Sequence, residues 1–320
     1  MDELLNWIPY KLERPNGFWQ LRWMDLGDWH IAEPFFDETI GICLSKMSER
    51  SMYRSMSDTS FLLKSCDKID AITPAAFIFH VSRCGSTLLS QALSTDQGNI
   101  VYAEAPLLDE ILRAPIRDKN LTETESEKWF KSALKIMGQQ RKSQYQQLFI
   151  KLDSWHIHSY PLLRKWFPET PFYFLTRKPD AVIVSHHKRR GVHAIPGFIE
   201  ADLLKVNLSE EHYRDFNFFT AEVLAAYYRE LHSLVLENNP LNHFYDYSWG
   251  MENLLAHFFS SIGMENANEN EMRKRLNFHS KYPDQPFNEE VKIEIPDYEN
   301  TNLVYQHLIA ALSAKRYPKI

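Results

Sequence analysis

The sequence contains little cysteine. Its 320 residues include only three, Cys43, Cys66 and Cys84. They are odd in number and far apart, and no CxxC pair occurs, so the sequence indicates neither a disulfide framework nor a zinc site. Few and scattered cysteines fit a reducing compartment, and we therefore expect a cytoplasmic protein.

Long apolar runs are also absent. No stretch reaches the roughly 18 apolar residues that a membrane-spanning helix needs. The N-terminal segment MDELLNWIPYKLERPNG starts with acidic residues and is soon interrupted by proline and arginine, whereas a signal peptide begins with basic residues followed by an apolar stretch. We therefore predict a protein that is not exported and has no membrane partner.

The chain has no excess of positive charge either. Its 36 lysines and arginines are outnumbered by 42 aspartates and glutamates, which gives a formal net charge of −6. This charge argues against nucleic acid or an anionic membrane as the main partner. Any phosphate group that the protein binds must therefore be held by a local group of basic side chains.

What the sequence does contain, from residue 75 onward, is an alternation of strand and helix patterns. Short, nearly continuous apolar runs are typical of strands buried on both faces, and apolar residues at helical spacing between them indicate helices. The expected strands are 75–81, 100–105, 148–152, 171–176 and 243–247. The expected helices are one that carries 88–93, one that begins at Pro179, and 123–142, 157–167, 219–237, 251–262 and 301–314.

This alternation predicts the fold class. We expect an α/β protein with a three-layer, P-loop NTPase-like parallel sheet and helices on both of its faces. Residues 73–320 would form this domain. Residues 1–72 lack the alternation and are predicted to be an N-terminal extension packed on it, with an extended and then helical pattern at 34–44.

Ligands of such sheets bind beyond the carboxyl ends of the strands. Four features of the sequence stand at or just after the end of an expected strand, namely Ser82–Thr87, Glu104, Lys151 and Arg177. The rule therefore predicts that they lie along one rim of the sheet, and that this rim carries the binding site.

The segment Ser82–Thr87 has the chemistry of a phosphate-binding loop. It precedes an expected helix, whose N-terminus offers unpaired N–H groups and a positive dipole end. Gly85 lets the backbone approach a ligand, Arg83 supplies a fixed charge, and the last two residues add hydroxyls. An ordinary turn with a surface arginine is the alternative. The nucleotide-triphosphate loop GxxxxGK(S/T) is excluded because no lysine separates Gly85 from Ser86.

Residues 83–88, RCGSTL, resemble the 5′-phosphosulfate loop of sulfotransferases that use 3′-phosphoadenylyl sulfate (PAPS), whose motif is roughly P-(K/R)-(S/T)-G-(S/T)-T. A serine replaces the usual proline and a cysteine the usual serine. Both changes are small. Any hydrogen-bond donor to phosphate that they remove can be supplied by the backbone instead. The resemblance implies donor contacts from Ser82, Arg83, Cys84, Gly85, Ser86 and Thr87.

A second segment carries the same resemblance. Residues 175–185, LTRKPDAVIVS, are similar to the 3′-phosphate motif R-(D/K)-P-x-D-x-x-x-S of the family. Arg177 and Ser185 are eight residues apart, as in that motif. An arginine at a strand end and a serine two turns into the next helix can converge on one phosphate. A surface Arg–Asp pair with a core-facing serine is the alternative.

The branch of the family that acts on protein tyrosines implies two catalytic residues. In that branch a glutamate serves as general base. The number of residues between the loop arginine and this glutamate matches the number between Arg83 and Glu104. That branch also has a lysine at a fixed number of residues before the 3′-phosphate arginine. The same number of residues separates Lys151 from Arg177. Glu104 would take the proton of the acceptor, and Lys151 with Arg83 would neutralise the departing charge. A solvated carboxylate and a surface lysine are the alternatives, and Asp153 competes as the base.

Two later segments resemble the family less closely. Tyr245 begins a segment similar to the late Y-(E/D)-x-L motif, in which the tyrosine lies near the nucleotide, although positions 248 and 249 depart from it. Ser280 and Lys281 belong to a basic stretch that we predict closes over the nucleotide. A solvated basic loop is the alternative there.

The histidines indicate no metal site. His156 and His158 form an HxH pair, and His186 and His187 are adjacent, but neither pair has a third ligand at a convincing spacing. We therefore expect no metal. A nucleophilic hydrolase is also disfavoured, because the chain has no GxSxG turn and Cys84 lies inside the predicted phosphate loop.

Taken together, the residues and the resemblance predict a sulfotransferase that transfers a sulfonate from PAPS to a hydroxyl or amine and releases adenosine 3′,5′-bisphosphate. The acceptor would be a small molecule, a glycan or a peptide. Two alternatives stay open. One is a nucleotide-dependent kinase or phosphotransferase on the same fold, which needs a metal-binding acid and usually a loop lysine. The other is a non-catalytic homologue that binds the nucleotide or a partner protein.

Overall fold

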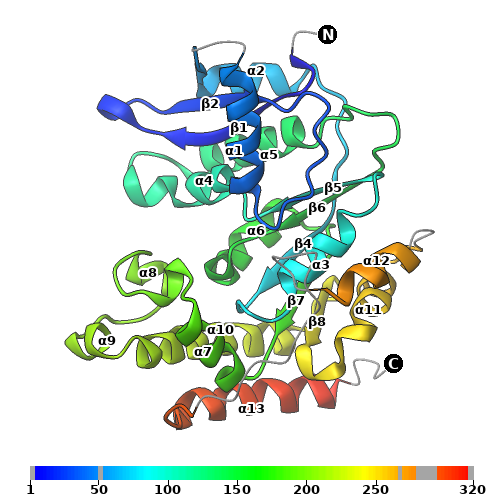
Figure 1. Ribbon diagram of the computed structural model, residues 1–320. Helices are drawn as coiled ribbons and strands as arrows, with labels where there is room; N and C mark the ends of the chain where they lie inside the picture. Colours follow the sequence, from blue (N-terminus) through cyan, green and yellow to red (C-terminus); the bar gives the residue numbers. More distant parts are fainter. Residues whose placement is uncertain (1–3, 50–52, 266–268, 279–293, 316–320) are drawn as a thin grey trace. The chain divides into compact units, whose positions relative to one another are not determined.

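The computed structural model describes residues 4–49, 53–265, 269–278 and 294–315 (Figure 1). The chain divides into two compact units. Unit 1 consists of Met1–Ala76 and Ser90–Leu152, and unit 2 consists of Phe77–Leu89 and Asp153–Ile320. The N-terminal extension that the sequence predicts for residues 1–72 thus belongs to a unit that also contains a later segment of the chain, and its separate role stays a prediction.

The fold class predicted from the sequence is confirmed. A five-stranded sheet has the order β5-β6-β4-β7-β8, and its strands within each unit pair in parallel. Helices flank it (Figure 1). The strands are β4 (Pro74–His80), β5 (Asn99–Ala103), β6 (Gln147–Lys151), β7 (Phe172–Thr176) and β8 (Asn242–Asp246), each within two residues of its expected range.

These strands form where the sequence is apolar because both of their faces are buried. Every residue of β5 and of β7 is buried. Aromatic side chains fill the space beside the sheet in unit 2, where Phe174 stacks on Phe79 at 4.8 Å and on Phe244 at 5.0 Å between ring centroids. The registers Phe77↔Phe172 and Phe172↔Asn242 align the carboxyl ends of β4, β7 and β8 within this unit.

Unit 1 also contains a second sheet that the sequence analysis did not predict. Three antiparallel strands have the order β1-β2-β3. The pattern is hard to recognise because β1 contains Pro9, the pairing slips between Pro9 and Lys11, and three consecutive residues of β1 are buried instead of alternating. The strands are β1 (Trp7–Glu13), β2 (Gln20–Asp25) and β3 (Ser55–Asp58).

The helices of unit 1 pack around these strands. The expected helix in 34–44 is confirmed as α1, and the expected helix 123–142 ends early, at Met137. Gly138 is the C-cap, where the backbone leaves the helical conformation (φ −83°, ψ 10°). Only glycine fits there, because an added Cβ would lie 2.6 Å from Ile72 O. The helices are α1 (Phe36–Ser48), α2 (Thr59–Cys66), α4 (Pro106–Arg117) and α5 (Glu123–Met137); α3 (Ser86–Leu93) starts in unit 2 and ends in unit 1.

The helices of unit 2 include the two that the sequence placed most clearly. Pro179 opens α7 (Pro179–Lys188), as predicted from its position. The long helix α10 (Phe216–Glu237) packs along α13 (Glu299–Ala314), and Thr301 Oγ1 donates to Ala221 O at 3.0 Å. The others are η3 (Ser154–Ser159), α6 (Tyr160–Trp166), α8 (Ala201–Leu204), α9 (Glu210–Arg214), α11 (Leu254–Ser261) and α12 (Glu269–Leu276).

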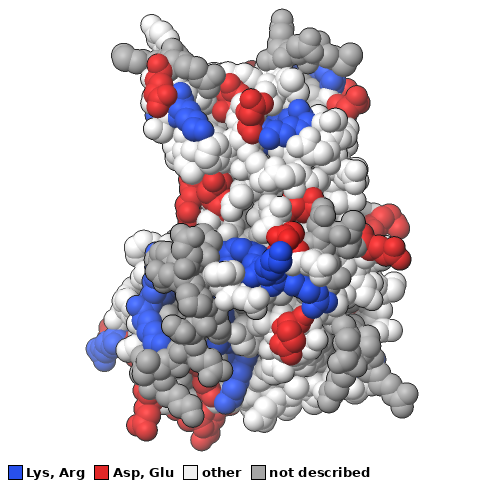
Figure 2. Space-filling view, turned by 45° about the vertical axis from the view of Figure 1, so that its right-hand side comes forward, with Lys and Arg blue, Asp and Glu red and all other residues white. Residues whose placement is uncertain are grey.

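Two surface properties bear on possible partners. Among the residues that the structure describes, no helix combines the length and the apolar character that crossing a bilayer requires. On the face drawn in Figure 2, lysine and arginine side chains gather near the middle of the picture, with acidic side chains around them. A chain with a negative net charge therefore still presents a local basic surface.

Candidate functional site

The predicted phosphate loop connects β4 to α3 and has an unusual backbone. Three of its residues adopt positive φ angles: Ser82 at 72°, Arg83 at 50° and Gly85 at 88°. Glycine adopts such angles readily, but each side-chain-bearing residue there costs about 1–3 kcal/mol. The surroundings of the loop must therefore hold Ser82 and Arg83 in place.

Gly85 also packs closely against the short segment Met251–Asn253. A Cβ at this position would lie 2.7 Å from Met251 Cε and 3.0 Å from Met251 Sδ, so this flexible side chain would have to move. The left-handed backbone is therefore the main reason for glycine here.

The remaining loop residues differ in what they offer a ligand. Ser86 begins α3, and Gly85 O accepts a hydrogen bond from Leu89 N–H at 2.9 Å, so the helix starts inside the loop. Ser86 is buried and Thr87 partly so. Cys84 is only 1% exposed, so its thiol is buried. Because α3 starts within the loop, the loop carries the N–H groups of a helix N-terminus.

Arg177 joins the second predicted motif to the loop. It follows β7, and its Nη1 donates to Arg83 O at 2.8 Å. Its guanidinium lies 4.3 Å from the centre of the Tyr247 ring, and its own carbonyl accepts from Tyr228 Oη at 2.6 Å. An arginine held by a loop carbonyl and an aromatic face is preorganised, and its other N–H groups have no acceptor among the described residues.

Ser185 lies on the buried side of α7, two turns from Pro179, and is 9% exposed. In the part of the chain that the structure describes, its hydroxyl has no hydrogen-bond partner. A serine hydroxyl can donate to a ligand oxygen, so a phosphate would be a suitable acceptor for it. Arg83 is half-buried, and its Nη2 donates to Arg189 O at the end of the same helix.

Tyr245, which the resemblance places near the nucleotide, has its side chain packed within the protein, and its contact with the nucleotide stays a prediction. Its ring is buried, packs edge-on against Trp249 at 5.4 Å, and its hydroxyl donates to Gly250 O. The hydroxyl is therefore already used inside the protein. The sequence analysis missed Tyr247, two residues further on, which is the aromatic residue that meets the Arg177 guanidinium.

A buried carboxylate fixes this region. Asp246, fully buried at the end of β8, accepts hydrogen bonds from Thr176 Oγ1 at 2.7 Å, Tyr305 Oη at 3.0 Å, and Ser248 N–H and Oγ at 2.9 and 2.6 Å. A buried charge is tolerated when it is hydrogen-bonded on all sides. Because Thr176 precedes Arg177, this network holds the strand end from which the arginine projects.

Unit 1 contains the pair that the sequence analysis assigned to catalysis. Lys151 Nζ forms an ion pair with Glu104 Oε1, and the lysine side chain is 0% exposed whereas that of the glutamate is 23% exposed. Glu104 has a positive φ of 55°, and its N–H donates to Lys151 O at 2.8 Å. The Lys151 ammonium also lies 5.5 Å from the centre of the Phe35 ring. The alternative of a surface lysine is wrong, because this lysine is buried.

Asp37 is a further acid beside this pair that the sequence analysis missed. It lies in the first turn of α1. Partial burial and then the charge of Glu104 raise the pKa of Asp37. A carboxyl beside a second carboxylate and a lysine is a common arrangement for proton transfer. No local pattern in the sequence could show it, because Asp37 and Glu104 are far apart in the chain.

The other predicted residues are placed as follows. Asp153, the competing base, belongs to unit 2 and opens η3, where its backbone N–H donates to His156 Nδ1 at 3.2 Å. Ser280 and Lys281 lie outside the described residues, so the predicted closing loop stays a prediction.

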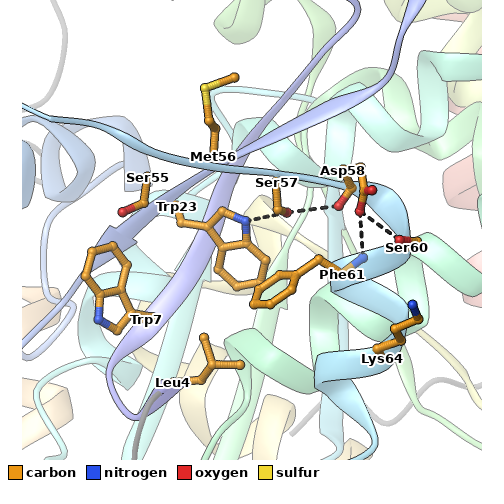
Figure 3. A pocket seen from close by; sticks show the side chains of 10 residues that line it. All are labelled: Leu4, Trp7, Trp23, Ser55, Met56, Ser57, Asp58, Ser60, Phe61 and Lys64. Carbon is orange, nitrogen blue, oxygen red and sulfur yellow. Dashed lines mark hydrogen bonds between the residues drawn. The ribbon is translucent and has the colours of Figure 1, made fainter.

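A pocket of about 570 Å³ lies in unit 1 beside β3 and the start of α2 (Figure 3). Trp23 and Phe61 meet edge to face in its wall at 5.5 Å, and Trp23 Nε1 donates to Ser57 Oγ at 2.8 Å. None of the residues predicted for the functional site lines it. The lining residues are Leu4, Trp7, Trp23, Ser55, Met56, Ser57, Asp58, Ser60, Phe61 and Lys64.

Comparison with known proteins finds similarity in structure alone. No protein-family model and no curated protein sequence matches the chain. The sulfotransferase domain of the Synechococcus PCC 7002 olefin synthase is 16% identical, with 78% of this chain and 96% of that chain covered and a TM-score of 0.45.

Two further solved structures show a similar likeness. The sulfotransferase domain from the curacin biosynthetic pathway is 16% identical, with coverages of 76% and 99% and a TM-score of 0.46. The sulfotransferase from Alicyclobacillus acidocaldarius is 13% identical, with coverages of 76% and 95% and a TM-score of 0.42. These scores describe a partial likeness of backbone arrangement, and the function proposed below depends on the residues of the site.

Proposed function

We propose that this protein is a sulfotransferase that uses PAPS as its sulfonate donor. The observation that carries the proposal is the hydrogen bond from Arg177 to the carbonyl of Arg83. It joins two motifs that are far apart in the sequence and that each resemble a PAPS-binding motif. Two phosphate-binding motifs in contact suit a ligand with two phosphate groups.

The donor site that we propose lies in unit 2. Backbone N–H groups of the loop would bind the 5′-phosphosulfate, because they stand at a helix N-terminus. The Arg83 side chain would add charge. Arg177 and Ser185 would bind the 3′-phosphate. The loop residues in this proposal are Ser82, Arg83, Cys84, Gly85, Ser86 and Thr87. Cys84 would act through its backbone N–H, whereas the Ser82 N–H donates to His80 Nδ1, so Ser82 would act by fixing the backbone of the loop.

The reaction that we propose is an in-line transfer. The acceptor oxygen or nitrogen forms a bond to sulfur, the bond between sulfur and the phosphate oxygen breaks, and adenosine 3′,5′-bisphosphate leaves. Glu104 would take the acceptor proton. Lys151 and Arg83 would stabilise the charge that develops on the leaving group. The buried ion pair of Glu104 with Lys151 supports this assignment, since a buried charged pair is seldom kept for stability alone.

The acceptor class stays broad. A hydroxyl or amine of a small molecule, a glycan or a peptide would satisfy the chemistry, and the net charge of −6 disfavours nucleic acid. No metal is needed, because alignment and fixed positive groups perform the work that a metal ion does in kinases.

The experiment is a transfer assay with ³⁵S-labelled PAPS and three pools of acceptors: phenols and alcohols, saccharides, and tyrosine-containing peptides. Each pool is assayed with EDTA present, beside a parallel assay of ATP with Mg²⁺. The proposal predicts label in at least one pool, undiminished by EDTA, and no phosphate transfer from ATP. Phosphate transfer that requires Mg²⁺, without sulfonate transfer, would contradict it in favour of a kinase.

A further inference from the structure

The strained backbone of the phosphate loop needs an explanation. Ser82 and Arg83 both adopt left-handed angles, which is unfavourable for residues with a Cβ. Such strain persists only where the surroundings enforce it, and it concentrates at sites where function needs a fixed geometry. Neighbouring residues must therefore hold Ser82 and Arg83 in this conformation.

Two buried histidines of unit 2 hold Ser82 from both sides. Ser82 N–H donates to His80 Nδ1 at 3.0 Å, and Ser82 Oγ lies 3.1 Å from His186 Nε2. All three residues are less than 10% exposed, with His186 at 1%. Hydrogen bonds in such a dry setting hold their partners firmly.

The proton of His186 can be assigned from its second partner. His186 Nδ1 accepts a hydrogen bond from Gly191 N–H at 3.2 Å, so this nitrogen carries a lone pair. In a neutral imidazole the other nitrogen then carries the hydrogen. His186 Nε2 therefore donates to Ser82 Oγ, and the Ser82 hydroxyl keeps its own hydrogen for another acceptor.

We infer that His186 is a positioning residue for the 5′-phosphate loop: it anchors Ser82 in its left-handed conformation, and so aims the N–H groups that follow toward a 5′-phosphate. This inference rests on the proposed function, because it specifies how the donor site is held ready. His186 acts through Ser82 and does not itself contact the donor.

Replacing a positioning His186 should affect the binding of the 5′-phosphate more than the binding of the 3′-phosphate. A loop whose backbone is no longer fixed binds the 5′-phosphate with lower affinity. The 3′-phosphate, bound by Arg177 and Ser185, depends less on the Ser82 conformation, because Arg177 meets the loop only at the Arg83 carbonyl and is also held by the Tyr247 ring and by Tyr228 Oη. A merely structural histidine would affect both ends alike when it is replaced, through general loss of stability.

The test is calorimetric titration with two ligands, adenosine 3′,5′-bisphosphate and adenosine 3′-phosphate, which lacks the 5′-phosphate. Two variants separate the two bonds of His186. In H186Q the amide nitrogen reaches the position of Nε2 and keeps the bond to Ser82, whereas H186N is too short to do so. The control is H187Q, the exposed neighbour, which bonds Asn217 at 3.1 Å.

We expect H186N to weaken the bisphosphate about tenfold, the value of one buried hydrogen bond, and to change the affinity for adenosine 3′-phosphate less than about twofold. H186Q should recover most of the loss, and H187Q should match the wild type. S82A removes only the hydroxyl and should change the two affinities as H186N does. If H186N fails to fold, the affinities of S82A test the positioning role.

The failures are distinguishable. Wild-type protein that binds neither ligand would refute the donor site and this inference together. Wild-type protein that binds both, with S82A and H186N weakening the two ligands equally or not at all, would overturn the positioning role and leave the donor site intact.

Discussion

Gly85 is the residue whose replacement should harm the loop most simply. An alanine there would have to adopt a φ of 88° and place its Cβ against Met251. We predict that Gly85→Ala weakens adenosine 3′,5′-bisphosphate binding at least about tenfold, because the left-handed backbone alone costs roughly 1–2 kcal/mol for a residue with a Cβ. Calorimetric titration measures this.

Gly41→Ala is the matched control for that change. Gly41 lies within α1, has no positive φ, and a Cβ there would have nothing within 4 Å. It should bind the nucleotide as the wild type does and be slightly more stable, since alanine favours a helix over glycine. Equal binding by both variants and the wild type would contradict the need for glycine in the loop.

Tyr247 provides a test of how Arg177 is held. The ring lies 4.3 Å from the guanidinium, an arrangement that contributes about 0.5–1 kcal/mol at partly exposed sites. We predict that Tyr247→Leu weakens bisphosphate binding roughly two- to fivefold, whereas Tyr247→Phe, which keeps the ring, binds normally. If both variants bind alike, the hydroxyl or simple packing is what matters, and the role assigned to the ring is wrong.

Glu104 is predicted to affect turnover rather than donor binding. Glu104→Gln should reduce sulfonate transfer by about 10²-fold or more, the usual contribution of a general base, with bisphosphate affinity unchanged. It should also lower the melting temperature, because it leaves the buried Lys151 charge without its partner. Asp37→Asn is the control and should keep most of the activity; an equal loss in both variants would mean that proton transfer needs both acids and would contradict Glu104 as the sole base.

The sequence allowed some of these residues to be predicted and hid others for a physical reason. Arg83, Arg177 and Ser185 were predictable because strand ends and short spacings place them. His186 was not, since its contact with Ser82 joins positions 104 residues apart. The contact of Tyr245 with the nucleotide stays a prediction; the sequence did not show that its hydroxyl donates to Gly250 O, the internal partner that a buried tyrosine needs.

At the scale of elements, the junction of β1 with α4 gives a prediction about pH. Leu12 N–H donates to Glu110 Oε2 at 2.5 Å. Burial raises the pKa of Glu110 from 4.5 to about 7, and the bond from Leu12 opposes this only in part. The folded state therefore holds a proton that the unfolded state releases above pH 4.5, so the protein loses stability as pH rises from 4.5 to 7.

Glu110→Gln should remove this loss, because glutamine still accepts from Leu12 and does not ionise. Between pH 5 and pH 8, the free energy of unfolding should fall less in the variant than in the wild type, by on the order of 1 kcal/mol. Urea denaturation at both values measures it. Glu125→Gln is the control: hydrogen bonds from Thr122 lower the pKa of Glu125, so its effect lies below pH 4.5 and the difference between pH 5 and 8 should match the wild type.

The elements themselves differ in how well the sequence predicts them. Strands β4, β5 and β7 were found because burial on both faces makes them apolar along most of their length. The antiparallel sheet was missed because β3 is nearly all exposed, with the sequence SMSD, and β1 contains a proline and a register shift. Such strands form through tertiary pairing, which leaves little mark on composition.

At the scale of the whole molecule, the predicted site residues divide between the two compact units. Both phosphate motifs belong to unit 2, and the Glu104–Lys151 pair belongs to unit 1. This division separates the account into two parts, a donor site and a proton-transfer pair, that variants can test independently. Because the net charge of the chain is −6, the proposed anionic donor would have to be bound by local basic groups and not by the electrostatic field of the whole chain.

The most direct test of the central claim is calorimetric titration of the wild type and Arg177→Ala with adenosine 3′,5′-bisphosphate, beside ATP with Mg²⁺. The account predicts micromolar binding of the bisphosphate without metal, weakened roughly 10- to 100-fold in the variant by loss of charged hydrogen bonds. Binding of ATP with Mg²⁺ but not of the bisphosphate, or equal bisphosphate binding by the variant, would contradict it.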